Sequence, residues 1–352
     1  MQARLNHKTS PPPQEKPMPF DDAPSTAAAR RRQLLRQGVA TLGVLAVPAI
    51  VRARSAARIR IGYWPVAAGL PFYAAVEKGY FNEAGLDVAP LKFASAQQVM
   101  EAMLAGRCDG SANGTGSGNL GVGALASPGL FKIIATNPSN ARHVLDEFLV
   151  PKDSPVKTIA ELKGKRIACG PGIQNKTLAG AVLERAGAGG TRVIELPIGQ
   201  HLAALAAGQV DAVYTLEPTG TVGRLNGSAR ILEAGVIAKY ILGDAQAPWH
   251  GGAATLTTEF IGKHPAEARK YIAAYARGIA LVRTRPDEAR QHLTGYTAIE
   301  GPLTAAVPLA SYMLYDEFRP ADIAAFQKFF DLFTDKGVFD KRLDVSALLF
   351  KD

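Results

Sequence analysis

The stretch AVEKGYFNEAGLDV, residues 75–88, determines how the chain folds around it. Gly79 can adopt a positive φ and so can end a helix, and Tyr80 and Phe81 pack beneath the turn. Gly85 provides a second stop just before an apolar strand. The stretch predicts a helix that is followed directly by a buried strand, the unit from which α/β sheets are built.

The same alternation of strand and helix continues on both sides of this stretch. Apolar runs of period two predict strands, and apolar residues on one face of a 3.6-residue repeat predict helices. In the helix over 95–105, the predicted buried stripe consists of Val99, Met100, Met103 and Leu104. The predicted strands cover 58–63, 86–93, 109–112, 130–135, 166–169, 192–196 and 210–216, and the predicted helices cover 70–84, 95–105, 175–186, 200–207, 266–284, 286–293, 302–314 and 321–334.

The order of these elements occurs twice along the chain. The stretch MLAGRCD, residues 103–109, has a counterpart in LAAGQVD, residues 205–211, and in both a glycine ends a helix shortly before an aspartate that precedes a strand. This weak internal repeat predicts two units of similar topology, each with parallel βαβ connections. The length of 352 residues also suggests two domains.

The first 57 residues have the features of an export signal. Residues 9–26 are rich in proline and carry no periodic apolar pattern, which predicts disorder. Arginines at 30–32, an uncharged apolar stretch over 38–51 and small residues up to Ala57 then follow in the order of a secretory signal. The arginine pair and the Leu-Leu after it favour the twin-arginine route over the general one, with cleavage near Ala57 and a periplasmic protein as the result. The alternative is an ordinary basic N-terminal arm.

Charge and composition exclude several other classes of protein. The net charge is +9, but residues 1–57 hold nine Lys/Arg and three Asp/Glu, so they carry +6 and the remainder carries only +3. The remainder therefore has no surface that predicts binding to nucleic acid. No apolar run is long enough to span a bilayer. Two cysteines without a Cys/His cluster of zinc spacing predict neither a disulfide scaffold nor a metal site.

Three segments together resemble one protein family. Residues 75–88 are similar to the A-x-E-K-G-Y-F-x-x-x-G-L-D-V signature of periplasmic solute-binding proteins of the nitrate, sulfonate, taurine and thiamine-pyrimidine-precursor type. SPVKTIAELKGK, residues 154–165, resembles the start of the family's second lobe, and VDAVYTLEP, residues 210–218, resembles its D-A-x-x-x-x-E-P strand. The matches occur in the family's order and together cover most of residues 58–265.

This resemblance implies a type II periplasmic binding protein fold. Two α/β lobes, each a mostly parallel sheet flanked by helices, then enclose a ligand in the cleft between them. Residues 58–148 and 249–352 are expected to form a discontinuous first lobe, and residues 149–248 the second. In sheets of this kind, ligands bind beyond the carboxyl ends of the strands.

That rule selects the loops that follow the predicted strands as candidate binding residues. The loop after the first strand offers aromatic faces with polar tips. The loop over 112–117 should open a helix whose first amides attract anions, and the loop over 170–177 lies between a strand and a helix in the same way. A lesser loop is expected over 137–140. The predicted substrate-binding residues in these four loops are Tyr63, Trp64, Pro65, Leu70, Asn113, Gly114, Thr115, Asn137, Gly172, Gln174 and Asn175.

Three further candidates come from the later part of the second lobe and its exit. Glu217 follows a strand, where its carboxylate could bind a ligand amine or hold a facing side chain. Residues 248–251 are expected to cross back into the first lobe, where Trp249 could stack on a ligand and His250 could donate to one. A purely structural role stays open for all three residues, and a lone histidine is more often structural. No arginine lies in the candidate loops to clamp a bare nitrate or sulfonate. This argues against such a ligand and leaves an organic ligand open, a heterocycle among them.

Two motifs and both cysteines receive structural interpretations. Residues 116–121 fit G-x-G-x-x-G but lie partly inside a helix, so Ala/Gly packing explains them better than a dinucleotide. Residues 170–177 resemble a phosphate-binding P-loop, but Asn175 stands where a glycine belongs. Cys108 and Cys169 fall in different lobes and are expected to be buried free thiols.

The leading hypothesis is a solute-binding component of an ABC importer with no catalytic residue, metal or cofactor. Such a protein closes its lobes on a small organic anion or heterocycle and delivers it to a membrane permease with its ATPase. We expect it to be a monomer. One alternative is a periplasmic receptor that presents its ligand to a sensor. The other is an enzyme like the pyrimidine synthases, which the leader and the lack of clustered cysteines disfavour.

Overall fold

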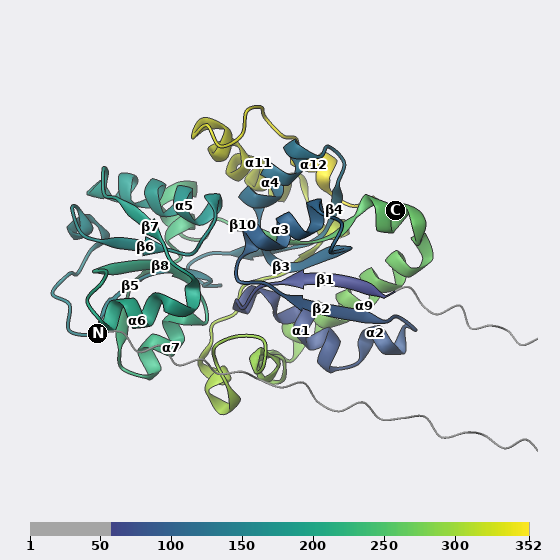
Figure 1. Ribbon diagram of the computed structural model, residues 1–352, viewed down its shortest axis with the longest axis horizontal. Helices are drawn as coiled ribbons and strands as arrows, with labels where there is room; N and C mark the ends of the chain where they lie inside the picture. The colour runs from purple at the N-terminus through teal and green to yellow at the C-terminus, as the bar shows by residue number, and fades with distance from the viewer. Residues whose placement is uncertain (1–57, 352) are drawn as a thin grey trace, which may run out of the picture. The chain divides into compact units, whose positions relative to one another are not determined.

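The computed structural model describes residues 58–351, so the predictions for the export signal lie outside the described residues. Within them, two β-sheets flanked by helices form an α/β architecture (Figure 1). We refer to each sheet with the helices packed on it as the first lobe and the second lobe. The predicted α/β fold with two lobes is confirmed.

The first sheet has six strands in the order β11-β4-β10-β3-β1-β2. Strands β1, β2 and β3 are parallel, whereas β10 runs antiparallel between β3 and β4. In Figure 1, α3, α4 and α11 lie on one side of this sheet and α1 and α2 on the other. The strands are β1 Ile59–Tyr63, β2 Val88–Lys92, β3 Gly110–Gly116, β4 Phe131–Ser139, β10 Trp249–Thr257 and β11 Met313–Leu314.

The second sheet has five strands in the order β7-β6-β8-β5-β9. Strands β6, β7 and β8 are parallel, and β5 runs antiparallel to both of its neighbours. Helix α5 covers one face and α6 and α7 lie on the other side (Figure 1). The strands are β5 Asp146–Pro151, β6 Ile167–Cys169, β7 Val193–Glu195, β8 Ala212–Leu216 and β9 Ala229–Ala234.

The helices follow the apolar patterns of the sequence, and short 3₁₀ and π turns link several of them. The α-helices are α1 Leu70–Glu77, α2 Tyr80–Glu83, α3 Ala96–Leu104, α4 Ser117–Ala126, α5 Ile173–Leu183, α6 His201–Ala206, α7 Thr219–Leu225, α8 Thr258–Lys263, α9 Pro265–Thr284, α10 Pro286–Arg290, α11 Pro320–Asp335 and α12 Val345–Leu348. The 3₁₀ and π turns are η1 Ala67–Gly69, η2 Ile159–Leu162, η3 Glu184–Ala188, η4 Ile198–Gln200, η5 Ile237–Leu242, η6 Gln291–Leu293, η7 Gly301–Ala306 and η8 Tyr315–Glu317.

The structure corrects several predicted elements. The helix expected over 70–84 is split into α1 and α2 because Gly79 adopts a φ of 70°, which no helix interior tolerates. The helix expected over 302–314 is wrong, since a 3₁₀ turn and the short strand β11 occupy that segment. Leu104 is 41% exposed, so it does not belong to the buried stripe of α3.

Two segments expected to be loops are strands. Residues 137–139 belong to β4, and residues 249–251 are the first three of β10 rather than a crossing between the lobes. Strand β3 also runs to Gly116, well beyond the predicted end at 112. In each case small or polar residues continue a buried strand, because neighbouring strands satisfy their backbone groups.

Candidate functional site

The carboxyl ends of β1 and β3 are held together by an aromatic side chain. The indole Nε1 of Trp64 donates a hydrogen bond to the carbonyl of Gly114 at 2.9 Å. The hydroxyl of Tyr73 donates to the carbonyl of Trp64 at 2.9 Å. Gly114 has a φ of 90°, and a Cβ there would lie 2.9 Å from a methyl group of Val66. Trp64 is therefore a buried side chain that holds the backbone of β3 at Gly114, where the chain has a positive φ. Its indole N–H already has a hydrogen-bond partner within the first lobe.

The remaining candidates of the first loop pack into the same lobe. The ring of Tyr63 lies 5.4 Å from that of Tyr73 and 5.5 Å from that of Tyr296. Leu70 is fully buried and Pro65 is half-buried. These three predicted ligand-binding residues thus pack within the first lobe.

A polar network around Gly114 connects β3 to β4. The side-chain oxygen of Asn137 accepts hydrogen bonds from the backbone amide of Gly114 at 3.1 Å and from the Asn113 carboxamide at 3.5 Å. The hydroxyl of Tyr275 donates to the Asn113 side chain at 2.6 Å. Thr115 is buried and donates to a carbonyl of its own strand. The Nδ2 group of Asn137 is buried without a hydrogen-bond partner among the described residues.

Strand β10 brings the next two candidates beside this network. Trp249 pairs with Ser139 of β4, and its ring lies 6.0 Å from that of Phe329. His250 receives a hydrogen bond from the Ser117 hydroxyl at its carbonyl, and its Nδ1 lies 3.0 Å from the Thr136 hydroxyl. Both side chains are buried, and Nε1 of Trp249 and Nε2 of His250 lack partners among the described residues.

Burial also determines the charge state of His250. It lowers the pKa of the imidazole to about 4, so the ring is neutral at physiological pH. A neutral imidazole has one N–H, and the ring stacks on Phe326 at 5.1 Å. The chemistry offered by β10 is therefore that of neutral donors and acceptors between aromatic faces.

The two lobes meet directly at Gln174, the second residue of α5. Its side-chain oxygen accepts a hydrogen bond from the backbone amide of Gly118 at 2.6 Å, and its Nε2 donates to the carbonyl of Gly251 at 2.9 Å. We call these two contacts the Gln174 bridge. The side chain is 5% exposed, and a Cβ at Gly116 or Gly118 would come within 2.8 Å and 3.1 Å of it. The small residues of the first lobe thus leave room for this side chain of the second.

A second contact between the lobes places Glu217 beside a buried carboxylate. The carbonyl of Glu217 accepts from the amide of Ala67 at 2.8 Å, while its carboxylate accepts from the amide and hydroxyl of Thr221. Glu147 is fully buried, accepts from the amide of Gly220 at 2.8 Å, and leaves its second oxygen without a partner among the described residues.

Desolvation dominates the titration of this pair. It raises the pKa of Glu217 to about 7. It also raises the pKa of Glu147 far above its ordinary value, and the nearby Glu217 charge raises it further. Asp146, the first residue of β5, has its pKa raised to about 7 by the same burial. The second lobe therefore holds protonatable carboxyls at the boundary where it meets Ala67.

The sequence-based selection of site residues is partly reflected in the geometry. The structure brings Trp64, Gly114, Asn113 and Asn137 into one network, whereas Gly172 and Asn175 bond within the second lobe to Glu195 and Pro171. Whether these residues touch a ligand stays a prediction.

Three residues that meet across the lobes, Ala67, Gly118 and Gly251, were not selected from the sequence. Neither was Glu147, which bonds to Gly220 within the second lobe. The adjacent Gly251 and Gly252 carried a usable signal, because a Cβ at Gly252 would lie 2.9 Å from the Cα of Gly114. Ala67 and Gly118 contact the second lobe through their backbone amides. The pattern of side chains in a sequence does not predict such contacts.

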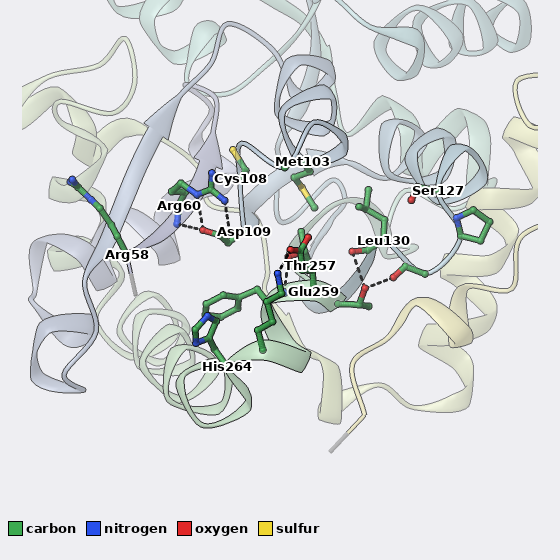
Figure 2. A pocket seen from close by; sticks show the side chains of 16 residues that line it. Arg58, Arg60, Met103, Cys108, Asp109, Ser127, Leu130, Thr257, Glu259 and His264 are labelled. Carbon is green, nitrogen blue, oxygen red and sulfur yellow. Dashed lines mark hydrogen bonds and ion pairs between the residues drawn. The ribbon is translucent and has the colours of Figure 1, made fainter. Parts of the chain in front are cut away.

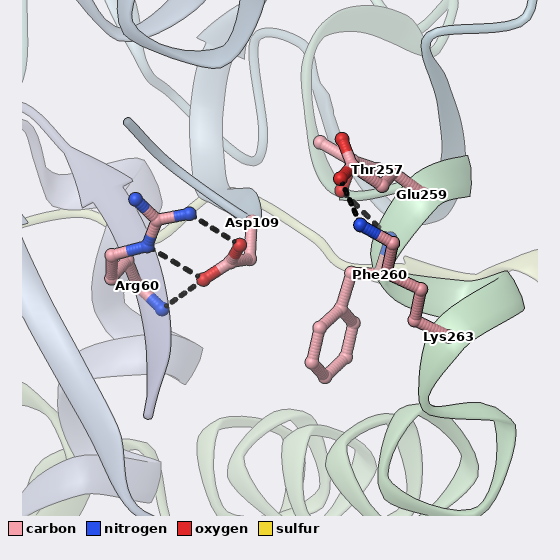
Figure 3. A network of polar contacts seen from close by, with 6 residues as sticks. All are labelled: Arg60, Asp109, Thr257, Glu259, Phe260 and Lys263. Atoms are coloured by element: carbon pink, nitrogen blue, oxygen red, sulfur yellow. Dashed lines mark hydrogen bonds and ion pairs between the residues drawn. The ribbon is translucent and has the colours of Figure 1, made fainter. Parts of the chain in front are cut away.

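A separate pocket of about 570 Å³ lies at the opposite edge of the first sheet (Figure 2). Its charges neutralise one another: Arg60 faces Asp109 at 2.7 Å and Lys263 faces Glu259 at 2.6 Å (Figure 3). This pocket lies at the amino ends of β1 and β3, where α/β sheets do not bind their ligands. It is therefore not the candidate site.

The described residues also bear on metals, membranes and thiols. In residues 58–351 no group of three or more His, Cys, Asp or Glu is arranged to hold a metal ion. None of the helices within that range is both long and apolar enough to cross a membrane. Cys108 and Cys169 are buried free thiols, as predicted, and desolvation raises their pKa to about 11 and about 12.

The fold and the contact zone between its lobes define a two-lobed α/β protein. A family model described as NMT1/THI5 like matches residues 67–289. The chain belongs to this family, and the resemblance found in the sequence is confirmed.

Individual relatives agree with this assignment. A protein of Escherichia coli named as an aliphatic sulfonates-binding protein is 24% identical over 334 residues, with 91% of this chain and 97% of that protein covered. The solved alkanesulfonate-binding protein SsuA from Xanthomonas axonopodis pv. citri, bound to MOPS, has a TM-score of 0.69 at 23% identity and covers 85% of this chain and 100% of its own. The periplasmic nitrate-binding protein NrtA from Synechocystis PCC 6803 has a TM-score of 0.60 at 14% identity, with 83% and 84% covered. These structures show that the fold is that of periplasmic binding proteins.

Proposed function

We propose that the chain is the extracytoplasmic solute-binding component of an ABC importer. It captures a small organic anion or heterocycle between its lobes and presents the closed form to a membrane permease with its ATPase. The family membership and the names of the relatives support this role. The protein acts as a monomer and catalyses no reaction.

The observation that carries the proposal is a pair of buried donors in the first lobe, on β10, whose Gly251 takes part in the Gln174 bridge, and on its neighbour β4. Asn137 and Trp249 lie on the neighbouring strands β4 and β10, and each has a buried N–H group without a partner among the described residues. A buried, unpaired N–H is costly, so such groups are expected to face an acceptor. A ligand with oxygen acceptors supplies that acceptor.

The side chains of the described residues support a binding role without catalysis. The two thiols are buried and their pKa is raised, which keeps them protonated and unreactive. His250 is neutral and stacked on Phe326 rather than paired with a nucleophile. These side chains favour binding over nucleophilic or redox chemistry.

The proposal includes the location and the lobe boundaries. Residues 1–57 serve as a twin-arginine export signal that is cleaved near Ala57, which delivers the protein to the periplasm. The lobe boundary expected at residues 148 and 149 lies three residues earlier in this proposal, because β5 of the second sheet begins at Asp146. Residues 58–145 and 249–352 then move as the first lobe, and residues 146–248 as the second.

A ligand screen combined with scattering tests the function. The protein is heated with small sulfonates, nitrate, carboxylates and pyrimidines, and a ligand at 100 times its Kd should stabilise it by about 2.7 kcal/mol. The same ligand should reduce the radius of gyration in small-angle X-ray scattering, because the lobes close. A stabilising ligand that leaves the scattering curve unchanged would argue against capture by closure.

A further inference from the structure

Strand β3 carries a bulge in its pairing with β10. The register between the two strands shifts there, so that residues 112–114 of β3 stand opposite Ala254 alone. Extra residues in one strand leave backbone groups without partners in the ladder, and such bulges are frequent next to functional sites. We call residues 112–114 the β3 bulge.

Three side chains bind the backbone of the β3 bulge. The hydroxyl of Tyr275 accepts a hydrogen bond from the amide of Asn113 at 3.2 Å. The amide of Gly114 donates to Asn137, and the carbonyl of Gly114 accepts from Trp64. These side chains come from α9, from β4 and from the residue after β1, so three separate segments of the first lobe converge on the bulge.

The carboxamide of Asn137 reaches the bulge across a strand that has no side chain at that point. Strand β10 lies between β3 and β4, and a Cβ at Gly252 would be 3.0 Å from Oδ1 of Asn137 and 2.9 Å from Cα of Gly114. A backbone N–H can only donate, so the oxygen end of the carboxamide faces Gly114. The Nδ2 group is therefore the other end, and it is buried without a partner among the described residues.

Asn137 also lies at the edge of the sheet where a ligand is expected. Strands β3 and β4 both run antiparallel to β10, so they run in the same direction. Asn137 is two residues from the carboxyl end of β4, and ligands of α/β sheets bind at the carboxyl ends of the strands. The free N–H of Asn137 thus lies where a solute acceptor is expected.

Tyr275 fixes the direction of the neighbouring carboxamide. Its oxygen accepts from the backbone of Asn113, and its proton goes to Oδ1 of Asn113 at 2.6 Å. Burial raises the pKa of Tyr275, so the hydroxyl keeps that proton. Because Oδ1 of Asn113 faces Tyr275, its Nδ2 faces Oδ1 of Asn137, at 3.5 Å. Tyr275 thereby supports both donors that hold the oxygen end of Asn137.

The helix that carries Tyr275 is held firmly against its neighbour. A Cβ at Gly278 would overlap the carbonyl oxygen of Pro71, so α9 and α1 approach closely. The ring of Tyr275 is fully buried and stacks on Phe72 with 6.4 Å between the centroids. The hydroxyl is therefore kept in one place relative to the sheet.

We propose that Tyr275 is a positioning residue for solute binding, because it keeps the Nδ2 group of Asn137 turned toward the bound solute. It acts through Asn113 and Gly114 rather than by contact with the solute. The proposal rests on the proposed function, in which the N–H of Asn137 meets an acceptor of the solute. It adds that the choice of an acceptor over a donor at this point is controlled from α9.

Isothermal titration calorimetry on the full chain tests the proposal. The probes are nitrate, methanesulfonate, trifluoroacetate and uracil, which all carry oxygen acceptors, and the one that binds the wild type most tightly is used with the variants. N137A removes the donor and should raise the Kd by about two- to tenfold, as the loss of one hydrogen bond predicts. Y275F should raise the Kd by about two- to fivefold.

A double-mutant cycle separates positioning from a purely structural role. If Tyr275 acts through Asn137, Y275F raises the Kd of the wild type but leaves that of N137A unchanged. A general loosening of the lobe would instead raise the Kd equally in both backgrounds. Y271F is the matched control, because Tyr271 is fully buried one turn away on α9 and its hydroxyl lacks a partner within residues 58–351. Its Kd should equal that of the wild type.

N137D tests which end of the carboxamide faces the solute. Aspartate keeps the oxygen that accepts from Gly114 and replaces the N–H by a second oxygen. At pH 8 its carboxylate cannot donate, so the Kd should rise about tenfold or more. At pH 5 a protonated carboxyl can donate again, and the ratio of its Kd to that of the wild type should fall. The wild type shares every other titrating group and is the reference at each pH.

The outcomes distinguish positioning from solute binding. If Y275F binds like the wild type, or weakens N137A as much as the wild type, the positioning role is overturned and solute binding stands. If N137D binds like the wild type at pH 8, the oxygen end faces the solute and the role is again overturned. If no probe binds the wild type, both proposals fail. Circular dichroism melts check folding, and N113A, which removes the link between Tyr275 and Asn137, should reproduce the Y275F pattern if Y275F does not fold.

Discussion

At the amino edge of each sheet an arginine and an aspartate form the same clamp. Asp109 accepts hydrogen bonds from the backbone amide, Nε and Nη2 of Arg60 at 2.8, 3.0 and 2.7 Å. Asp211 accepts the same three from Arg166 at 2.8, 3.1 and 2.7 Å. In both lobes the clamp lies at the amino ends of two neighbouring parallel strands, β1 and β3 in the first lobe and β6 and β8 in the second.

The carboxyl edges of the same sheets differ. The first lobe ends β3 in glycine and small residues and offers backbone amides, as at Gly118. The second lobe offers the side chain of Gln174 and the backbone carbonyl of Glu217 at the boundary, and Glu147 is buried within that lobe. The amino ends of the strands, with the same clamp in both lobes, stabilise the sheets. The carboxyl ends, which differ between the lobes, carry the groups that are available to a ligand. Substitutions at the two edges should therefore have different kinds of effect.

The largest expected effect is on the pH dependence of stability through Glu217. Its pKa is about 7 in the folded protein, above that of an exposed glutamate, so the folded state binds the proton more tightly. The stability of the protonated form is complete below about pH 4 and is lost as pH rises to about 7. E217Q removes this loss. Urea unfolding should show equal stability near pH 4 and a gain of about 2–3 kcal/mol for E217Q near pH 8.

The comparison between variant and wild type isolates this group. The pKa of His201 and of His250 is lowered to about 4, so burial of these rings raises stability with pH in the opposite sense, but it does so equally in both proteins. E161Q, at an exposed carboxylate of the second lobe, is the control and should follow the wild type. A pH-independent difference between E217Q and wild type would show that Glu217 does not titrate in this range.

The second expected effect tests the clamp in each lobe. D109A removes three hydrogen bonds to a charged group that is 19% exposed, and should cost about 2 kcal/mol of unfolding free energy. D211A removes the same bonds at a site that is 32% exposed, where water screens the pair, and should cost less. Denaturant unfolding of both variants measures the difference. Equal losses would mean that exposure does not distinguish the two clamps.

The repeated edge was also the part that the sequence predicted best. The LAGRCD and LAAGQVD stretches contain both aspartates, and local stops and apolar periods gave most strands and helices around them. Prediction failed where neighbours decide the structure. Residues 137–139 and 249–251 lack strong strand propensity, but each pairs with a strand that is distant in sequence.

The boundary between the lobes was predicted only in part for a related reason. Gln174 was selected as a loop residue that could bind a ligand, and the structure shows it joining backbone groups of Gly118 and Gly251. Those partners come from segments more than 50 residues away and expose no distinctive side chain. A sequence motif indicates which groups a side chain can bind. The fold determines which backbone groups come within hydrogen-bond distance of that side chain.

The smallest expected change in stability is at the Gln174 bridge, where the change in shape is informative. Q174A removes two hydrogen bonds between the lobes, which should cost about 1 kcal/mol and shift the ligand-free protein toward an open form. Scattering should then show a larger radius of gyration than for wild type.

N175A is the matched control, because Asn175 is equally buried on the same helix but bonds to Pro171 within its own lobe. It should lose a similar amount of stability without any change in the radius of gyration. If both variants scatter alike, the closed arrangement depends on contacts other than the bridge, and the divergent edge of the second lobe does not control closure.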